Sequence, residues 1–132
     1  MLHGVLKKFV LFLAKLFFYF YGFMWALGAP KARKVSEVLE LFYIRFLRVQ
    51  RNHVEVVKLD DYELVTRCRN PCPILWLSLR LSLDTKFTCR YISEPVCKYV
   101  LKRLNPNLVF ERNYNGIRPY KDYCEERILL KS

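Results

Sequence analysis

Five cysteines are the residues of this chain best suited to chemistry, and they recur near the ends of predicted elements. A thiolate acts as a soft metal ligand, a nucleophile or a redox partner, roles that few other side chains fill. In chain order they are Cys68, Cys72, Cys89, Cys97 and Cys124. Because their number is odd and no cleavable signal is convincing, we expect reduced thiols in a cytoplasmic setting rather than a disulfide scaffold.

The same cysteines offer a metal site as one interpretation. Cys68, Cys72, Cys89 and Cys124 supply enough thiolates for a tetrahedral zinc or for an iron centre. Their spacing differs from the paired Cys-x2-Cys of many zinc modules. The plain alternative is that Cys97, just inside a predicted helix, and Cys72 are small buried apolar groups. Zinc or iron is therefore expected only if the first interpretation holds.

The chain is basic, and its charge is concentrated in the first half. Lys and Arg number 23 against 12 acidic residues, a net charge of +11. Residues 1–52 hold nine basic and two acidic side chains, and hydrophobic residues make up 53% of the chain. A basic, aromatic-rich segment attracts anionic surfaces. Because Leu and Phe separate these cations, we expect lipid or a protein as the partner and not nucleic acid.

The N-terminal segment is the most apolar part of the chain. Phe9 to Ala29 contains a single charge, Lys15, and as a helix it would span about 30 Å, enough to cross a bilayer core. Lys15 would be costly at mid-membrane, and Gly22 suits a helix packed on protein. Two interpretations stay open for residues 9–29: membrane association, with the following domain on the cytoplasmic face, or a buried or homodimer-forming helix. We divide the chain into this helix, 1–29, and a domain, 30–132.

Periodicity and turn signals predict the other elements. A helix begins near Val35 after the break at Pro30. Two β-rich runs around an acidic turn predict a hairpin, and two later runs predict a second pair of strands. These strands are expected over His53–Leu59, Tyr62–Cys68, Leu108–Tyr114 and Tyr123–Lys131. On the last strand, Cys124 and Glu126 share a face with Ile128 and Leu130.

The segment between the two pairs of strands holds one clear helix and one ambiguous run. The helix begins with Ser93 as N-cap and ends at Asn105-Pro106. In residues 74–84, leucines alternate with polar residues at the period of a strand, although Pro71 and Pro73 would suit the start of a helix. The local pattern alone favours a strand there.

A set of short motifs runs through the second half of the chain. They are Cys68/Cys72-Pro73, Cys89, Asn105-Pro106, Phe110-Glu111-Arg112 and Cys124. In this order they resemble the L-2-amino-thiazoline-4-carboxylic acid hydrolase-like family, over roughly residues 53–131, and that family is similar to the 4-vinyl reductase domain. The resemblance implies an α+β fold: N-terminal helices, then an antiparallel sheet of about four strands with two helices inserted between its hairpins. It also implies a helix over 74–82 and a small-molecule pocket.

The resemblance implies hydrolysis of a C–N or C–S bond with cysteine participation, which needs a nucleophile and a proton donor. Cys89 and Cys124 lie in the family motifs, and with Glu126 they are the candidate catalytic residues. The candidate ligands for a substrate carboxylate are Arg67, Arg90 and Arg112. We expect a small-molecule-binding domain of this family. A metal-binding sensor and a membrane-attached or dimerising structural protein are the alternatives.

Overall fold

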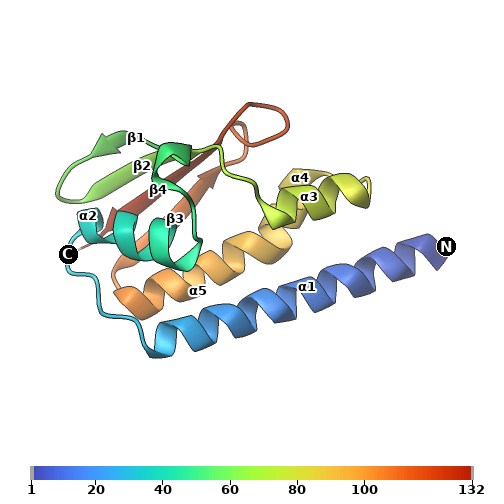
Figure 1. The fold of residues 1–132 in the computed structure, drawn as a ribbon, viewed down its shortest axis with the longest axis horizontal. Helices are drawn as coiled ribbons and strands as arrows, with labels where there is room; N and C mark the ends of the chain where they lie inside the picture. Colours follow the sequence, from blue (N-terminus) through green and yellow to red (C-terminus); the bar gives the residue numbers. More distant parts are fainter. Residues whose placement is uncertain (1, 132) are drawn as a thin grey trace.

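A four-stranded antiparallel sheet forms one layer of the computed structural model, which describes residues 2–131 (Figure 1). The spatial order of the strands is β1-β2-β4-β3. Their bounds are β1 (Val54–Leu59), β2 (Glu63–Cys68), β3 (Leu108–Asn113) and β4 (Cys124–Leu130). The predicted α+β class, with N-terminal helices followed by an antiparallel sheet, is confirmed, as are both predicted pairs of strands.

The helices form the second and third layers. Helix α5 (Glu94–Leu104) packs against β3, and α1 (Leu2–Leu27) packs against α5, so Figure 1 shows α5 between the long N-terminal helix and the sheet. The short α2 (Val35–Val38) continues directly into the π-helical segment η1 (Leu39–Phe46), and α2 contacts β2 and β4. A short 3-10 turn, η2 (Arg51–His53), leads into β1.

The sheet directs alternate side chains of its two central strands into the molecule. On β2, Leu64, Thr66 and Cys68 are buried, as the period of a strand requires. In the antiparallel register, Thr66 lies opposite Glu126 and Cys68 lies opposite Cys124. The predicted shared face of Cys124 and Glu126 is therefore confirmed, and it faces the helices.

Helix α1 buries one stripe and leaves the rest of its surface exposed. Leu11, Gly22 and Ala26 are buried, while Phe18 and Trp25 pack on the main core. Gly22 allows a close approach, because a Cβ there would lie 2.9 Å from Val100 Cγ2 of α5. The helix is long and apolar enough to cross a membrane, and most of its apolar stretch is not buried in the fold.

The strand that the local pattern alone favours over residues 74–84 is not formed. Residues Pro73–Arg80 form helix α3, which starts with Pro73 in its first turn. The Ser78 hydroxyl donates to the Ile74 carbonyl oxygen at 2.7 Å, and Ile74 and Ser78 are buried one turn apart. Leu77 and Leu81 are also four residues apart, so the leucine alternation contained a helical spacing as well. The helix implied by the family resemblance is confirmed.

Ser93 is not the N-cap that its position in the sequence suggested. It has helical backbone angles and caps nothing, because the helical chain already begins with α4 (Thr85–Thr88) and continues through the π-helical η3 (Cys89–Ser93) into α5. Asp84 is the true cap: its side chain accepts the Lys86 N–H at 2.9 Å. The prediction missed α4 and η3 because it placed the cap at Ser93, nine residues after the true cap Asp84.

Candidate functional site

A cavity of about 730 Å³ lies between α1, α3, η3 and the adjoining end of the sheet. Its size falls within the range of small-molecule sites, roughly 300–1,000 Å³. Most of its wall is apolar. The apolar lining residues are Ala14, Phe17, Phe18, Tyr21, Phe46, Leu47, Val49, Pro71, Pro73, Ile74, Trp76 and Leu77.

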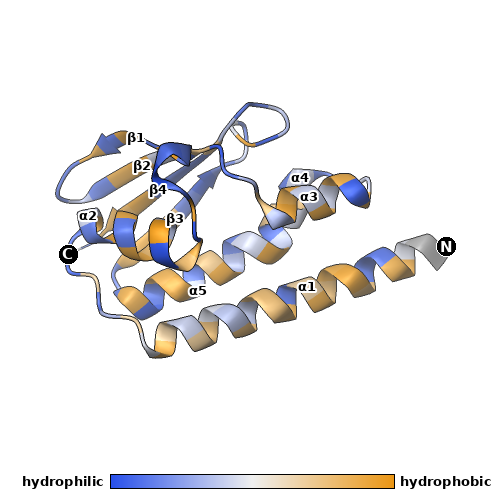
Figure 2. Cartoon of the chain, in the orientation of Figure 1, coloured by the Kyte–Doolittle hydropathy of each residue, from blue (hydrophilic) through white to orange (hydrophobic). Residues whose placement is uncertain are grey.

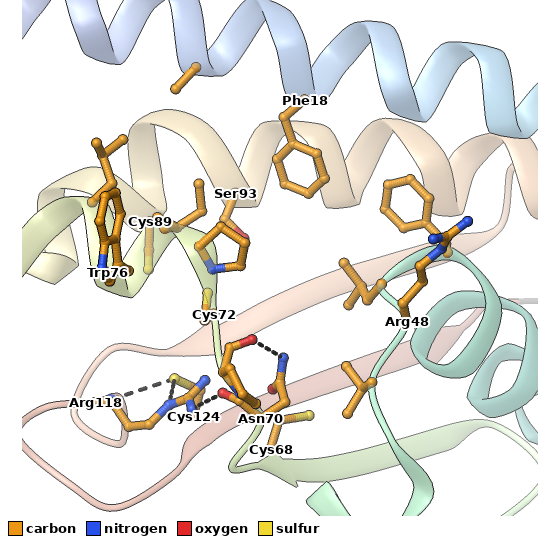
Figure 3. Close-up of a pocket in the computed structure, with 18 of the residues that line it drawn as sticks. Phe18, Arg48, Cys68, Asn70, Cys72, Trp76, Cys89, Ser93, Arg118 and Cys124 are labelled. Carbon is orange, nitrogen blue, oxygen red and sulfur yellow. Dashed lines mark hydrogen bonds between the residues drawn. The ribbon is translucent and has the colours of Figure 1, made fainter.

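Four of the five thiols line this cavity. They are Cys68 from β2, Cys72 before α3, Cys89 from η3 and Cys124 from β4. Figure 3 shows Cys89 and Trp76 on one side, Phe18 reaching in from α1, and Cys68 and Cys124 at the opposite wall. The fifth, Cys97, is fully buried in α5 and lies outside the lining, in agreement with its interpretation as a packing residue. The fold therefore brings together, from four separate segments of the chain, the four cysteines that the sequence offered as candidate metal ligands.

Cys124 has the most distinctive surroundings of these thiols. Its Sγ accepts the backbone N–H of Arg118 at 3.5 Å and the Arg118 Nε–H at 3.3 Å (Figure 3). The same guanidinium donates through Nη1 to the Asn70 carbonyl oxygen. Arg118 therefore joins the loop before β4 to the segment after β2, and it places positive charge against a half-buried sulfur.

Two of the other lining thiols, Cys68 and Cys89, have environments that oppose ionisation. Burial raises the pKa of Cys68, and the neighbouring Glu126 raises it further. Burial also raises the pKa of Cys89 to about 11, although the Arg112 charge acts in the opposite direction. A nucleophilic thiol needs a thiolate near neutral pH. The catalytic role of Cys89 stays a prediction, and the burial of its thiol works against it.

Glu126 and Arg112 form a buried ion pair at the floor of the cavity. The Arg112 Nε–H donates to Glu126 Oε2 at 3.0 Å and Nη2 donates to the same oxygen, and each side chain is only 6% exposed. The Tyr43 hydroxyl donates to Glu126 Oε1 at 2.9 Å and accepts the Thr66 hydroxyl at 2.8 Å. Both carboxylate oxygens are thus occupied, so Glu126 is held as an acceptor for three donors rather than as a free base.

One donor of this pair has no partner within the described chain. Arg112 lines the cavity, and its Nη1 is buried without a hydrogen bond. Burial by itself would lower the pKa of Arg112, but the charge of Glu126 raises it well above the usual value, so the guanidinium stays charged. A buried, unsatisfied donor costs free energy. Nη1 itself is covered by protein, so an acceptor atom on a bound molecule would reach it only after neighbouring side chains move.

Two of the three predicted carboxylate ligands lie outside the cavity. Arg67 points from the other face of β2, where its Nε–H donates to Glu125 at 2.9 Å and its guanidinium covers the Tyr123 ring. Arg90 is exposed and stacks over Tyr114, with its Cζ 4.2 Å from the ring centroid. Arg67 lies next to Cys68 on a strand and therefore points to the opposite face. Arg90 follows Cys89 in the helical η3, where consecutive side chains also point in different directions.

The described structure does not bring the candidate metal ligands close enough together to form a metal site. Among residues 2–131, no three Cys, His, Asp or Glu side chains come close enough together to hold a metal ion. Cys68, Cys72, Cys89 and Cys124 line one cavity but are distributed around its wall. In a tetrahedral zinc site each zinc–sulfur distance is about 2.3 Å, so the sulfur atoms must lie close together. The expectation of zinc or iron at these four cysteines is therefore corrected.

Sequence reasoning missed two cationic residues of the lining, Arg48 and Arg118. Arg48 follows η1 in a left-handed backbone conformation, φ 57°, which non-glycine residues adopt at a cost. This conformation ends the helix and turns Arg48 to the cavity wall seen in Figure 3. Neither residue belongs to a motif, so only the fold could find them.

Comparison of the chain with protein-family models, with curated proteins and with solved structures found no match. The resemblance to the hydrolase-like family rests on its motifs alone and stays a prediction.

Proposed function

We propose that the chain is a small-molecule-binding domain whose cavity holds an apolar molecule with an acidic group. The observation that carries the proposal is Arg112, a buried charged residue that lines a mainly apolar cavity and has one donor, Nη1, without a partner in the described chain. Ligand sites commonly combine an apolar wall with a few fixed polar groups. The resemblance to the 2-amino-thiazoline-4-carboxylic acid hydrolase-like family agrees with a carboxylate ligand.

The charges of the lining support an anion over a cation. Arg48, Arg112 and Arg118 line the cavity together with one carboxylate, Glu126, which is already paired with Arg112. The remaining positive charge lies on Arg48 and Arg118. A carboxylate in this weakly solvated space gains more from such charges than it would in water. The apolar part of the ligand would then lie against the phenylalanines of α1.

Calorimetric titration with three chain-matched probes tests this assignment: decanoate, decanol and decylamine. We expect saturable binding of decanoate at one site, roughly tenfold tighter than decanol, because charge-assisted hydrogen bonds to a buried donor contribute about 1.5–3 kcal/mol. Decylamine should bind weakest. Equal affinities for all three would show that the arginines do not select the ligand, and no saturable binding would overturn the proposal.

A hydrolytic use of the site is a second candidate, favoured by the two Arg118 donors on Cys124 Sγ. These two contacts hold the partly buried Cys124 Sγ at the cavity wall, which makes Cys124 the best placed nucleophile of the four by position. Peptide mapping after brief treatment with iodoacetamide at neutral pH tests it. Labelling at Cys124 ahead of the other cysteines, and lost in Arg118→Met, would support the candidate; uniform labelling would reject it.

A further inference from the structure

The outer surface of α1 is an uninterrupted apolar face, and nothing in the described chain covers it. Eleven large hydrophobic side chains of this helix are exposed: Val5, Leu6, Phe9, Phe12, Leu13, Leu16, Phe17, Phe20, Phe23, Met24 and Leu27. We name this set the α1 outer face, and Figure 2 shows the helix mainly in the colour of hydrophobic residues. Contiguous exposed apolar surface of this extent marks a site of interaction.

The one charge within the apolar segment does not interrupt this face. Lys15 is half-buried on the packed side of α1, where its Nζ lies 4.4 Å from the centroid of the Tyr91 ring. A cation over an aromatic ring is stabilised without a carboxylate. Lys15 was the main argument against membrane contact, and its position removes that objection for the outer face.

Cations lie at both ends of the face. Lys7 and Lys8 belong to the first turns of α1, and Arg33 and Lys34 follow its end. The first acidic residue of the chain is Glu37, so no carboxylate offsets these charges within the helix. An apolar face flanked by lysines and arginines is typical of helices that lie on anionic lipid.

We propose that the α1 outer face docks on an anionic membrane surface, with the helix lying in the plane of the interface. A second copy of the chain is a poorer occupant, because antiparallel helices would bring Lys7 and Lys8 against Arg33 and Lys34 of the other copy. A parallel pair would superimpose the same like charges. The net charge of +11 adds to this repulsion.

Packing favours an in-plane helix over one that crosses the bilayer. Helix α1 contacts α5 and η3, and the buried Gly22 allows the close approach to Val100. Crossing the membrane would separate α1 from the domain and expose that stripe. An in-plane helix keeps every one of these contacts and inserts only the exposed face.

Docking on this face would also bring the cavity to the lipid. Phe17 is 78% exposed and lines the cavity, and Trp76, 59% exposed, lines it from α3. An apolar ligand could then pass between the bilayer and the cavity past these two rings. Only this last step rests on the proposed function; the docking itself does not.

Flotation of the full chain with lipid vesicles tests the docking. We expect binding to phosphatidylcholine vesicles containing about one-third phosphatidylglycerol, weaker binding to pure phosphatidylcholine, and release by high salt. Phe20→Glu should reduce binding at least about tenfold, while Leu59→Glu, at an exposed apolar residue of β1, should not. Should Phe20→Glu misfold, Lys7→Gln with Lys8→Gln replaces it and should lower binding to the anionic vesicles by roughly tenfold.

Three results would overturn the inference. The first is wild-type protein that ignores anionic vesicles. The second is a wild-type dimer in light scattering that Phe20→Glu converts to monomer, because the face would then bind a second copy. The third is protein that resists extraction at alkaline pH and high salt, which would indicate a helix that crosses the bilayer. Decanoate binding in solution is unaffected by these outcomes, so the two proposals fail separately.

Discussion

Arg112 and Glu126 lie opposite each other on β3 and β4 and form an ion pair that is almost completely removed from water. Both residues line the cavity, and the Arg112 Nη1 is buried without a hydrogen-bond partner in the described chain. The charge of Glu126 keeps Arg112 protonated where burial alone would favour its neutral form. The same contact therefore joins β3 to β4 and, under the proposed function, holds a cationic side chain at the binding site.

Removing one member of this pair should destabilise the protein strongly. Glu126→Gln leaves the Arg112 charge buried without compensation, so we expect a loss of about 3–5 kcal/mol in urea unfolding. The matched control is Glu125→Gln, the adjacent residue on the opposite face, whose half-exposed pair with Arg67 should cost less than about 1 kcal/mol. Equal losses in the two variants would show that the buried Arg112–Glu126 pair contributes no more to stability than the half-exposed Arg67–Glu125 pair. Arg112→Met combined with Glu126→Leu should recover much of the loss.

Gly22 should be intolerant of any side chain. Gly22→Ala places a Cβ about 2.9 Å from Val100 Cγ2, and a β-branched side chain cannot easily turn away. We expect a net destabilisation of about 1–3 kcal/mol despite the better helix propensity of Ala. Gly4→Ala, in the same helix with nothing within 4 Å, should be neutral or stabilising. Unfolding midpoints would measure both; a neutral Gly22→Ala would mean that α1 packs less closely than described.

Asp84→Ala should lower the melting temperature by roughly 2–5 °C, because Asp84 caps α4 through Lys86 and also accepts the Tyr120 hydroxyl. Ser93→Ala, at the residue first expected to be the cap, should change it little. The hydrogen bond from the Lys86 backbone lowers the pKa of Asp84, so its contribution is present above about pH 4 and lost as pH falls through the lowered pKa. The difference between Asp84→Ala and wild type should therefore shrink in acid.

Cys89 should react slowly with iodoacetamide until the solution is strongly alkaline. Its pKa of about 11, raised by burial from an ordinary 9.0, leaves about a hundredfold less thiolate near pH 8 than an exposed cysteine has. Labelling followed by peptide mapping should place its rate midpoint near pH 11. Because the folded pKa exceeds the unfolded one, the thiol stabilises the fold fully below about pH 9 and this contribution is lost as pH rises through 11. Fast labelling at pH 7 would contradict the described burial.

The sheet and its inward faces were predictable because they depend on local alternation. Cys124 and Glu126 share a face whatever the tertiary structure, and burial of the apolar Ile128 on that face decided which side points inward. The leucine spacing alone did not predict helix α3, because it fits the period of a strand as well as that of a helix. Pro73 in the first turn and the hydrogen bond from Ser78 to the Ile74 carbonyl oxygen favour the helix.

The cavity itself depends on long-range contacts that no local pattern contains. Tyr43 reaches Glu126 across 83 positions of the sequence, and Arg118 reaches Asn70 across 48. Arg48 enters the lining only through a left-handed residue at the end of η1. Motifs identified the thiols and Arg112, but the partners that give each its chemistry come from the packing of separate elements.

The proposed function requires the cavity to be the binding site. The measurement is the dissociation constant of decanoate for two variants that add the same ring to α1: Ala14→Phe, inside the cavity, and Leu13→Phe, on the exposed surface. We expect Ala14→Phe to weaken binding at least about tenfold, because the ring occupies ligand volume, while Leu13→Phe binds like wild type. Undiminished affinity in Ala14→Phe, with both variants folded, would contradict the account and place the ligand elsewhere.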